Sequence, residues 1–368
     1  MNASATLTSR ERVNRMFARK DHDRMPRHEG CWLETLDRWM EEGLPADNHD
    51  DAFAVVQKHL GGDLQMVNWY WPHSFPGREE VIEEDEDTRV TKGPSGTIER
   101  FWKNKSGTPE HLGWECDERE IWESTYKPAM LEQPVQIDIE TVRKQVEKAE
   151  RHKRWTYLAG VGPFEVIRKI LGDELFMMNL IDEPDWIEDM ARISMDNFIR
   201  NYQVVLDAGI QADGLWIFDD MAFRTATFCS PAMYRELLWP QHQRLAEFAH
   251  ANGMKFIYHT DGDVRQVVPD YIEAGFDCLQ PLEAKASMDV RELVPRYGEE
   301  LAFFGNIDVT KLITNDLDII EEEIASKLTV ARESKGYIYH SDHSVPPQVS
   351  WETYQAVIRF LDKYGTYG

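Results

Sequence analysis

Residues 255–263 read Lys-Phe-Ile-Tyr-His-Thr-Asp-Gly-Asp, and this stretch decides the fold. A short apolar run suited to a β-strand ends abruptly in a histidine and two aspartates, with a glycine between the aspartates for a tight turn. Imidazoles and carboxylates contribute little to a hydrophobic core. They suit a site at the C-terminal ends of parallel strands, where the strands converge. The stretch therefore predicts a strand that delivers polar side chains to a functional site.

The same design recurs near the C-terminus, where residues 336–347 read Gly-Tyr-Ile-Tyr-His-Ser-Asp-His-Ser-Val-Pro-Pro. Stretches with helical periodicity separate such runs, and strands that alternate with helices imply parallel pairing. The chain has no Gly-x-Gly-x-x-Gly or phosphate-loop motif, which favours a (β/α)8 TIM barrel over a doubly wound sheet. The expected strands are Arg27–Trp32, Leu64–Asn68, Trp155–Gly160, Gly214–Phe218, Phe256–Tyr258, Cys278–Leu282, Leu301–Gly305 and Tyr337–Tyr339.

Two additions to the barrel are expected. Thr8 and Glu11 have the spacing of a capping box and predict an N-terminal helical extension. Residues 78–127 carry a run of acidic residues and the strong turn signal Gly93-Pro94-Ser95-Gly96. This segment is interpreted as an antiparallel hairpin insertion with a solvated acidic face, inside a single domain that spans residues 1–368.

Composition narrows the classes of function. The 368 residues carry a formal net charge of −25, which repels phosphate backbones and argues against nucleic acid as a partner. Four cysteines are scattered without Cys-x-x-Cys spacing, which favours a reducing cytosol over a disulfide framework. The polar residues 1–15 do not resemble a signal peptide, and no apolar window is long enough to span a membrane. A cytoplasmic protein is expected, with a homodimer as one possible assembly.

Polar residues follow several of the expected strands, and the barrel would bring them to one rim. Any single aspartate here is well explained as a helix cap. The whole set is better explained by an active site, because successive strands end in the same way. The rim residues are Asp219, Asp220, His259, Asp261, Glu283, Asn306, Asp308, His340, Asp342 and His343.

Two kinds of chemistry fit the rim. His259, Asp261 and His343 together resemble a catalytic zinc site, with two imidazoles, a carboxylate and an open position. His340 and Asp342 could instead form an acid–base pair without metal. Adjacent side chains on a strand point in opposite directions, so only one of Asp219 and Asp220 is expected to face the site. Asp220, at the strand end, is the predicted catalytic carboxylate, with His340 and Asp342 as the further catalytic residues.

An aromatic cluster follows the first two expected strands. Core packing is the common reason for such residues, but at the barrel mouth they would form a flat apolar pocket for a planar substrate. The predicted substrate-binding residues are Trp32, Trp69, Tyr70, Trp71 and His73, with Glu283 and Asn306 from the rim.

At this point the chain resembles the uroporphyrinogen decarboxylase superfamily over nearly its whole length. The resemblance implies the same barrel fold. The segments that carry it are Thr8–Val13, Asp23–Pro26, Phe218–Asp220, Ser230–Tyr234, Lys255–Gly262, Gly305–Asp308 and Ser341–Pro347.

Two branches of the superfamily differ in their motifs. True uroporphyrinogen decarboxylases carry an arginine-bearing Met-Arg-Gln-Ala-Gly-Arg segment after the first strand, for the carboxylates of the substrate. Here residues 29–34 read Glu-Gly-Cys-Trp-Leu-Glu, without arginine. In the corrinoid-linked methyltransferases, a zinc site resembles His-x-Cys with a distant cysteine. This chain keeps the histidine as His259 but has Asp261 and His343 at the positions that match the cysteines.

The departure suggests a harder ligand set, better matched to oxygen than to a thiol. The resemblance therefore implies a Zn²⁺-dependent methyltransferase that passes a methyl group from a small donor, such as a methoxyaromatic, to the corrinoid of a separate partner protein. One alternative is a metal-free decarboxylase or lyase of a small aromatic acid, with Asp220 and His343 as acid and base, or an activity like that of uroporphyrinogen decarboxylase. A second alternative is a non-catalytic binding protein on the same scaffold.

Overall fold

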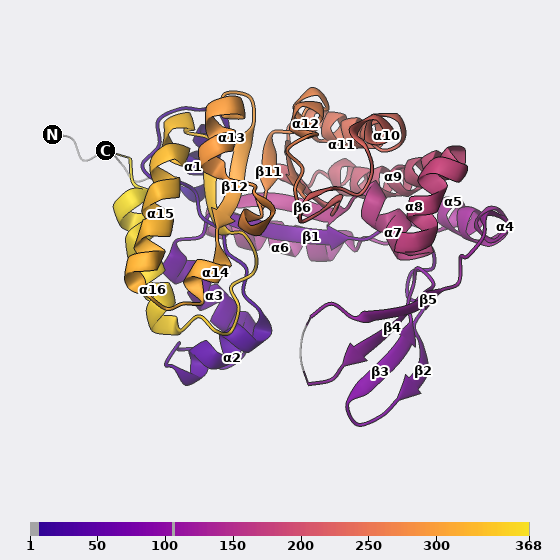
Figure 1. The fold of residues 1–368 in the computed structure, drawn as a ribbon, viewed down its shortest axis with the longest axis horizontal. Coiled ribbons are helices and arrows are strands. Elements are labelled where there is room, and N and C mark those ends of the chain that lie inside the picture. The colour runs from indigo at the N-terminus through magenta and orange to yellow at the C-terminus, as the bar shows by residue number, and fades with distance from the viewer. Residues whose placement is uncertain (1–6, 105–106, 368) are drawn as a thin grey trace.

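The computed structural model describes residues 7–104 and 107–367, and it has an α/β fold built on a curled parallel sheet (Figure 1). Seven strands pair in the order β1-β6-β7-β10-β11-β12-β13. They are β1 (Leu64–Tyr70), β6 (Trp155–Val161), β7 (Gly214–Phe218), β10 (Lys255–His259), β11 (Cys278–Gln280), β12 (Ala302–Ile307) and β13 (Tyr337–Ser341). These seven lie on the strands that the sequence predicts after the first, with ends shifted by up to a few residues.

Helices cover the outer face of this sheet. The N-terminal region holds α1 (Ser9–Phe17), α2 (Leu33–Glu41) and α3 (His49–Leu60). The others are α6 (Ile139–Arg151), α7 (Pro163–Leu171), α8 (Asp173–Asp182), α9 (Pro184–Asp207), α10 (Pro231–Leu237), α11 (Trp239–Ala251), α12 (Val268–Glu273), α13 (Val290–Tyr297), α14 (Val309–Leu312), α15 (Leu317–Ala331) and α16 (Trp351–Tyr364). A two-stranded ribbon, β8 (Ala222–Phe223) and β9 (Ala226–Thr227), follows β7.

Both faces of the sheet are buried, which is why its strands are apolar without alternation. One cluster lies on the inner face of the curl and includes Trp155, Trp216, Phe304 and residues from the other strands. A larger cluster lies between the sheet and the helices. Val13 and Met16 of α1 belong to the inner cluster, so the predicted N-terminal helix packs against the inner face. Its capping box is formed, with Glu11 N–H donating to Thr8 Oγ1 at 3.2 Å.

The first expected strand, Arg27–Trp32, is not a regular strand. It makes two isolated bridges to the last part of the sheet, Arg27 with Tyr339 and Cys31 with Val345. Pro26 has no N–H to donate, which limits pairing at its start. The gap between β13 and β1 is still spanned by backbone hydrogen bonds, from His28 N–H to Tyr339 O at 3.0 Å and from Asp63 N–H to Arg27 O at 2.8 Å. The ring of strands is therefore bridged but not fully closed.

Asp63, just before β1, holds this gap together. Its carboxylate is fully buried and accepts hydrogen bonds from Arg12 at 2.7 Å and from Arg24 at 2.7 Å. It also accepts the backbone N–H of Arg27 at 2.9 Å. One buried carboxylate thus connects α1, the segment that carries Arg24 and Arg27, and the start of β1.

The insertion is larger than the predicted hairpin. It is a four-stranded antiparallel sheet, β2 (Glu80–Glu84), β3 (Thr88–Lys92), β4 (Thr97–Trp102) and β5 (Glu110–Trp114), which projects below the main sheet in Figure 1. The short helices α4 (Arg119–Ile121), η1 (Trp122–Tyr126) and α5 (Lys127–Glu132) lead back. The predicted turn at Gly93–Gly96 joins β3 to β4, and all five residues of the acidic β2 are exposed as expected.

Within the described residues, the structure contains no helix with the length and apolar character that crossing a membrane requires.

We expect Asp63→Asn to lower the free energy of unfolding by about 3 kcal/mol, because it removes a buried charge that pairs with both Arg12 and Arg24 and leaves Arg12 with Asp23 alone. Urea denaturation followed by circular dichroism measures the change. Asp37→Asn is the control, because Asp37 forms an exposed pair with His49 and its loss costs less than about 1 kcal/mol. Equal losses in the two variants would contradict the role given to Asp63.

Candidate active site

The polar residues that follow β7, β10, β11 and β13 meet at the C-terminal ends of these strands. Parallel pairing of neighbouring strands brings those ends together. Of the predicted rim residues, the structure brings together Asp220, His259, Asp261, Glu283 and His343. These five are called the rim cluster below.

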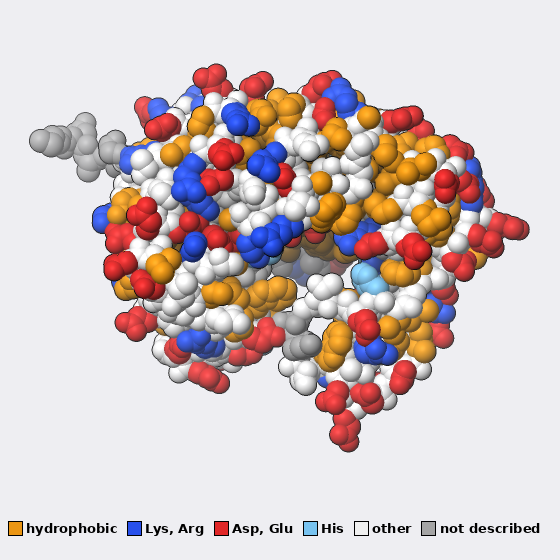
Figure 2. Space-filling view, viewed as in Figure 1, with side chains coloured by type: hydrophobic (Ala, Val, Ile, Leu, Met, Phe, Trp, Pro, Cys, Tyr) orange, Lys and Arg blue, Asp and Glu red, His pale blue; other side chains and the backbone are white. Residues whose placement is uncertain are grey.

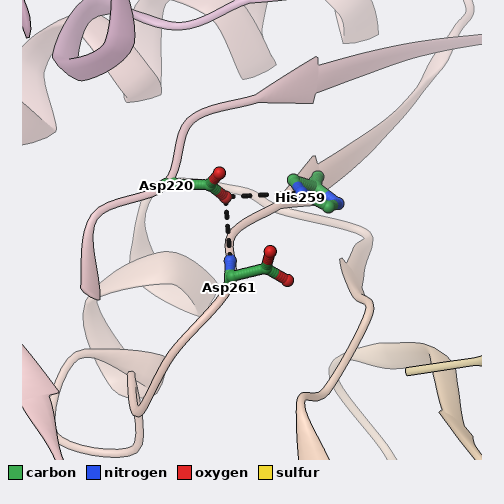
Figure 3. A group of neighbouring side chains, drawn as sticks. All are labelled: Asp220, His259 and Asp261. Carbon is green, nitrogen blue, oxygen red and sulfur yellow. Dashed lines mark hydrogen bonds and ion pairs between the residues drawn. The ribbon is translucent and has the colours of Figure 1, made fainter. Parts of the chain in front are cut away.

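His259, at the end of β10, is held on both ring nitrogens. Its Nδ1 is hydrogen bonded to Gln280 Oε1 at the end of β11, and its Nε2 lies 3.3 Å from Asp220 Oδ1 (Figure 3). Because the amide oxygen of Gln280 can only accept, Nδ1 carries the proton and Nε2 is the nitrogen that faces the site. This arrangement fixes both the tautomer and the ring direction.

Asp261 lies between the two histidines of the rim cluster. Its Oδ2 is 3.7 Å from Nε2 of His343, and its Oδ1 is buried without a hydrogen-bond partner among the described residues. His343 Nδ1 lies 3.7 Å from Oδ1 of the fully buried Asp342. Each histidine therefore has Nδ1 toward an acceptor and Nε2 toward a carboxylate.

Consecutive backbone amides position the two outer carboxylates. The N–H of Asp261 donates to Asp220 Oδ1 at 2.9 Å, and the N–H of Gly262 donates to Glu283 Oε2 at 2.9 Å. Gly262 has a φ of 86°, and a Cβ there would lie 2.5 Å from the backbone of Ala222. Only glycine fits this turn without strain, so the glycine that the sequence singled out shapes the rim cluster.

The electrostatics of the rim cluster follow from these contacts. Burial acts to lower the pKa of His259, but the hydrogen bond and charge of Asp220, with a contribution from Asp261, raise it to about 9. Burial acts to raise the pKa of Asp220, yet the hydrogen bond and charge of His259 keep it below its ordinary value. Burial and the charges of Asp220 and Glu283 raise the pKa of Asp261. Without metal, His259 is thus a cation at neutral pH, paired with Asp220.

The rim cluster has the composition of a metal site. Two groups of three have ligand atoms within 4.8 Å of one another: Asp220, His259 and Asp261, and Asp261, Glu283 and His343. Asp261 belongs to both, whereas the two histidines fall into different groups. The hydrogen bond from Nδ1 of His259 to Gln280 is the outer support that metal-bound histidines usually have. The unpartnered Oδ1 of Asp261 is a buried atom that a cation would satisfy.

Three other predicted residues lie outside the rim cluster. Asp342 accepts the backbone N–H groups of Ala284 at 3.1 Å and Val309 at 3.0 Å, so it supports the loops beneath His343. Asn306 is fully buried, accepts from Val290 N–H at 2.9 Å and donates to Leu282 O at 2.7 Å.

His340 lies within the curl, stacked on His28 with ring centroids 5.6 Å apart. Its Nε2 is 3.8 Å from the fully buried Glu29, below the rim cluster.

Asp219 faces the helices. It is fully buried and lies 2.7 Å from Nε2 of His242 on α11, whereas Asp220 faces His259. The two neighbouring side chains thus point to different surroundings, and Asp219 packs between the sheet and the helices. Asp308 caps α14 through the N–H of Thr310 at 2.8 Å.

The predicted aromatic residues separate into two groups. Trp32 and Trp69 are each 42% exposed, and the ring of Trp69 lies 5.0 Å from that of Phe218, which lies 4.6 Å from His259. Trp69 and Phe218 therefore form an aromatic path to the rim cluster.

The remaining aromatic residues are directed elsewhere. Tyr70 is buried and bonded to Asn197, and the stacked rings of Trp71 and His73 contact the insertion through Ser95. Figure 2 shows that the surface is hollowed between two parts of the molecule: the part that holds α2 and α3, and the insertion.

Sequence reasoning missed three residues around the site. Gln280 and Phe218 are the last residues of β11 and β7, and the sequence predicted them only as parts of strands. Glu165, in the first turn of α7, has its backbone N–H bonded to Asp219 and its carboxylate 2.9 Å from Arg168. Burial and the charge of Asp220 raise the pKa of Glu165 to about 7. The sequence could have indicated Glu165, because Gly162 and Pro163 end β6 and start α7, which places Glu165 near the C-terminal ends of the strands.

Comparisons with known proteins agree with this architecture. A family model described as uroporphyrinogen decarboxylase (URO-D) matches residues 122–364, which is more than half of the chain. A search of curated sequences finds no match.

Among solved structures, a methyltransferase from Methanosarcina mazei is similar in fold, with a TM-score of 0.63 and 18% identity over 97% of this chain and 99% of the other. Fungal β-1,4-galactanases have a TM-score of 0.44 and 8% identity over 91% of this chain and 99% of theirs. A Cellulomonas fimi endo-β-1,4-mannanase has a TM-score of 0.40 and 14% identity over 91% of this chain and 76% of its own. The two glycosidase matches are too weak to support a functional comparison.

We expect Asp220→Asn to lower the pKa of His259 in the metal-free protein from about 9 to below the ordinary imidazole value of about 6.5. The negative charge that favours the protonated ring is lost, while burial still favours the neutral ring. An NMR pH titration of the His259 ring measures the change. Asp263→Asn is the control, because Asp263 pairs with Arg265 at 2.7 Å. An unchanged His259 pKa in Asp220→Asn would refute this account.

Proposed function

Because this chain belongs to the uroporphyrinogen decarboxylase family, we propose that it is a metal-dependent methyltransferase that moves a methyl group from a small donor, such as a methoxyaromatic, to a corrinoid protein. The observation that carries the proposal is the rim cluster, in which both histidines have Nδ1 toward an acceptor and Nε2 toward a carboxylate. In this proposal the fold is a (β/α)8 barrel whose first strand is reduced to bridges.

The proposed metal is Zn²⁺, bound at the rim cluster through His259, Asp261 and His343, with Asp220 and Glu283 beside them; His259 and His343 belong to different groups of possible ligands, both of which include Asp261. Imidazole and carboxylate ligands suit zinc, and this set without thiolates suits an oxygen-bearing substrate. When bound, the ion would act as a Lewis acid toward the oxygen that keeps the electron pair as the methyl–oxygen bond breaks. The similarity in fold to a protein named as a methyltransferase is compatible with this reaction.

The chain's own residues would bind and orient the donor. Trp69 and Phe218, with ring planes tilted by 57° to one another, line an apolar path that ends at His259, which fits an aromatic ring placed with its substituent at the rim cluster. The side chain of Trp32 is exposed, and its backbone N–H donates a hydrogen bond to the carbonyl of Val345, in the loop that carries His343. Asp342 and Gln280 would act as positioning residues, because each faces the Nδ1 of a histidine.

A metal-free decarboxylase of a small aromatic acid is a second candidate, and one observation favours it. Without metal, His259 is a cation beside the Asp220 carboxylate, and a buried pair of this kind can bind a substrate carboxylate or transfer a proton. The two candidates differ in product. Decarboxylation releases carbon dioxide from an aromatic acid without any corrinoid, whereas methyl transfer consumes a reduced corrinoid.

We expect His259→Ala to reduce methyl transfer by on the order of 100-fold, because it removes a ligand and disturbs the placement of Asp220. The assay mixes the zinc-loaded protein with methoxyaromatic compounds and cob(I)alamin, and it follows the visible spectrum as methylcobalamin forms. His49→Ala is the control, because His49 lies on α3 in an exposed pair with Asp37. Carbon dioxide release that persists without metal or corrinoid would replace the methyltransferase proposal with the second candidate.

A further inference from the structure

The geometry of the rim cluster points to two metal positions, and we propose that it binds two divalent ions bridged by the Asp261 carboxylate. This inference rests on the proposed function and deepens it, because it concerns the number of ions that the same site holds. One position would use Asp220, His259 and Asp261, and the other would use Asp261, Glu283 and His343. Each position would have one histidine, one carboxylate of its own and one shared carboxylate.

The separation of the two histidines argues against a single ion. Ligand atoms that surround one zinc ion at its usual distance lie within about 4.2 Å of one another, twice the metal–nitrogen distance of roughly 2.1 Å. The atoms of each group of three already lie within 4.8 Å of one another, so a small adjustment would close either group around an ion. His259 and His343 do not share a group. A single ion at either position would therefore leave one histidine and one carboxylate outside its coordination.

The two positions have the same supporting structure. Asp220 and Glu283 are anchored by the backbone N–H groups of Asp261 and Gly262, which are neighbours in the chain. Each of these hydrogen bonds uses one carboxylate oxygen, Asp220 Oδ1 and Glu283 Oε2, and Asp220 Oδ1 is also the oxygen that lies 3.3 Å from Nε2 of His259. The turn thus places one carboxylate on each side of Asp261.

The two histidines are also distributed one to each position. Nδ1 of His259 is hydrogen bonded to Gln280, and Nδ1 of His343 lies 3.7 Å from the Asp342 carboxylate. With Nδ1 directed to an acceptor, Nε2 of each ring is the ligand atom, and these two atoms lie beside Asp220 and Asp261 respectively. His259 thus has a hydrogen-bonded outer support, whereas Nδ1 of His343 faces the Asp342 carboxylate without a hydrogen-bond partner among the described residues.

Asp261 is placed to bridge the positions. Its Oδ2 faces His343, while its Oδ1 is buried and has no hydrogen-bond partner among the described residues. A carboxylate that gives one oxygen to each of two ions is suited to the spacing of about 3.5–4 Å in two-metal sites.

Metal stoichiometry tests the proposal on the full-length protein. The protein is freed of metal with a chelator, titrated with Zn²⁺ in a calorimeter, and passed through gel filtration for metal analysis. We expect two zinc ions per chain in the wild-type protein. Co²⁺ provides a second readout, because its visible absorption should develop in two steps as two sites fill.

Variants test whether the two positions are separate. His259→Ala should keep the position at Glu283 and His343, and Glu283→Gln should keep the position at Asp220 and His259, so each should bind one ion. Asp261→Asn should weaken both. Asp263→Asn, next to the rim cluster but paired with Arg265, should still bind two and controls for loose binding to acidic residues. Circular dichroism and thermal unfolding of the metal-free forms show whether each variant is folded.

The outcomes separate this inference from the proposed function. One zinc ion per chain with methyl transfer intact overturns the two-ion inference and leaves the methyltransferase proposal standing. No zinc binding overturns both. Two zinc ions that are both lost in folded His259→Ala and in folded Glu283→Gln would overturn the assignment of separate positions. Two ions in the wild type and one in each of these variants support the inference, whatever donor the enzyme is found to use.

Discussion

The buried carboxylate of Asp63 is the constraint on which the rest of the structure depends. It accepts hydrogen bonds from Arg12, from Arg24 and from the backbone of Arg27, where regular strand pairing is missing. A buried carboxylate with two guanidinium partners is strongly favoured over the same groups with one partner removed. Because it fixes the edge of the curl, it also sets where the opposite, C-terminal ends of the strands converge.

At the C-terminal ends of the strands, the arrangement of the side chains lowers the stability of the fold. Three carboxylates and two histidines lie within one small cluster, and one carboxylate oxygen of Asp261 has no hydrogen-bond partner in the described part of the chain. Such groups would be paired or exposed if stability alone were selected, and strongly shifted pKa values at a strand rim are typical of functional sites. The turn at Gly262 makes the arrangement possible, since its amide and that of Asp261 hold Glu283 and Asp220 in place.

The same rim shows how packing divides residues that look alike in sequence. Asp219 and Asp220 are neighbours, yet the first contacts His242 beneath the helices and the second contacts His259. His340 and His343 lie in one short motif, yet the first stacks on His28 inside the curl and the second faces Asp261. Proximity in the motif therefore does not imply a shared role. The catalytic assignments, the single-domain organisation, the cytoplasmic location and the homodimer stay predictions.

Local sequence determined a good deal of this protein. Apolar runs bounded by turns and helical periodicity predicted the seven strands of the sheet, and the polar residues after Phe218 and Tyr258 predicted the rim. Strand alternation predicted that only one of Asp219 and Asp220 faces the rim, and the place of Asp220 at the strand end made it the choice. The reduction of Arg27–Trp32 to two bridges, the burial of Asn306 and the split of the rim cluster into two groups sharing Asp261 appeared only in the folded chain. They depend on contacts between residues far apart in sequence, which periodicity and motif spacing do not encode, because these report only how a segment is patterned and not which distant segment packs against it.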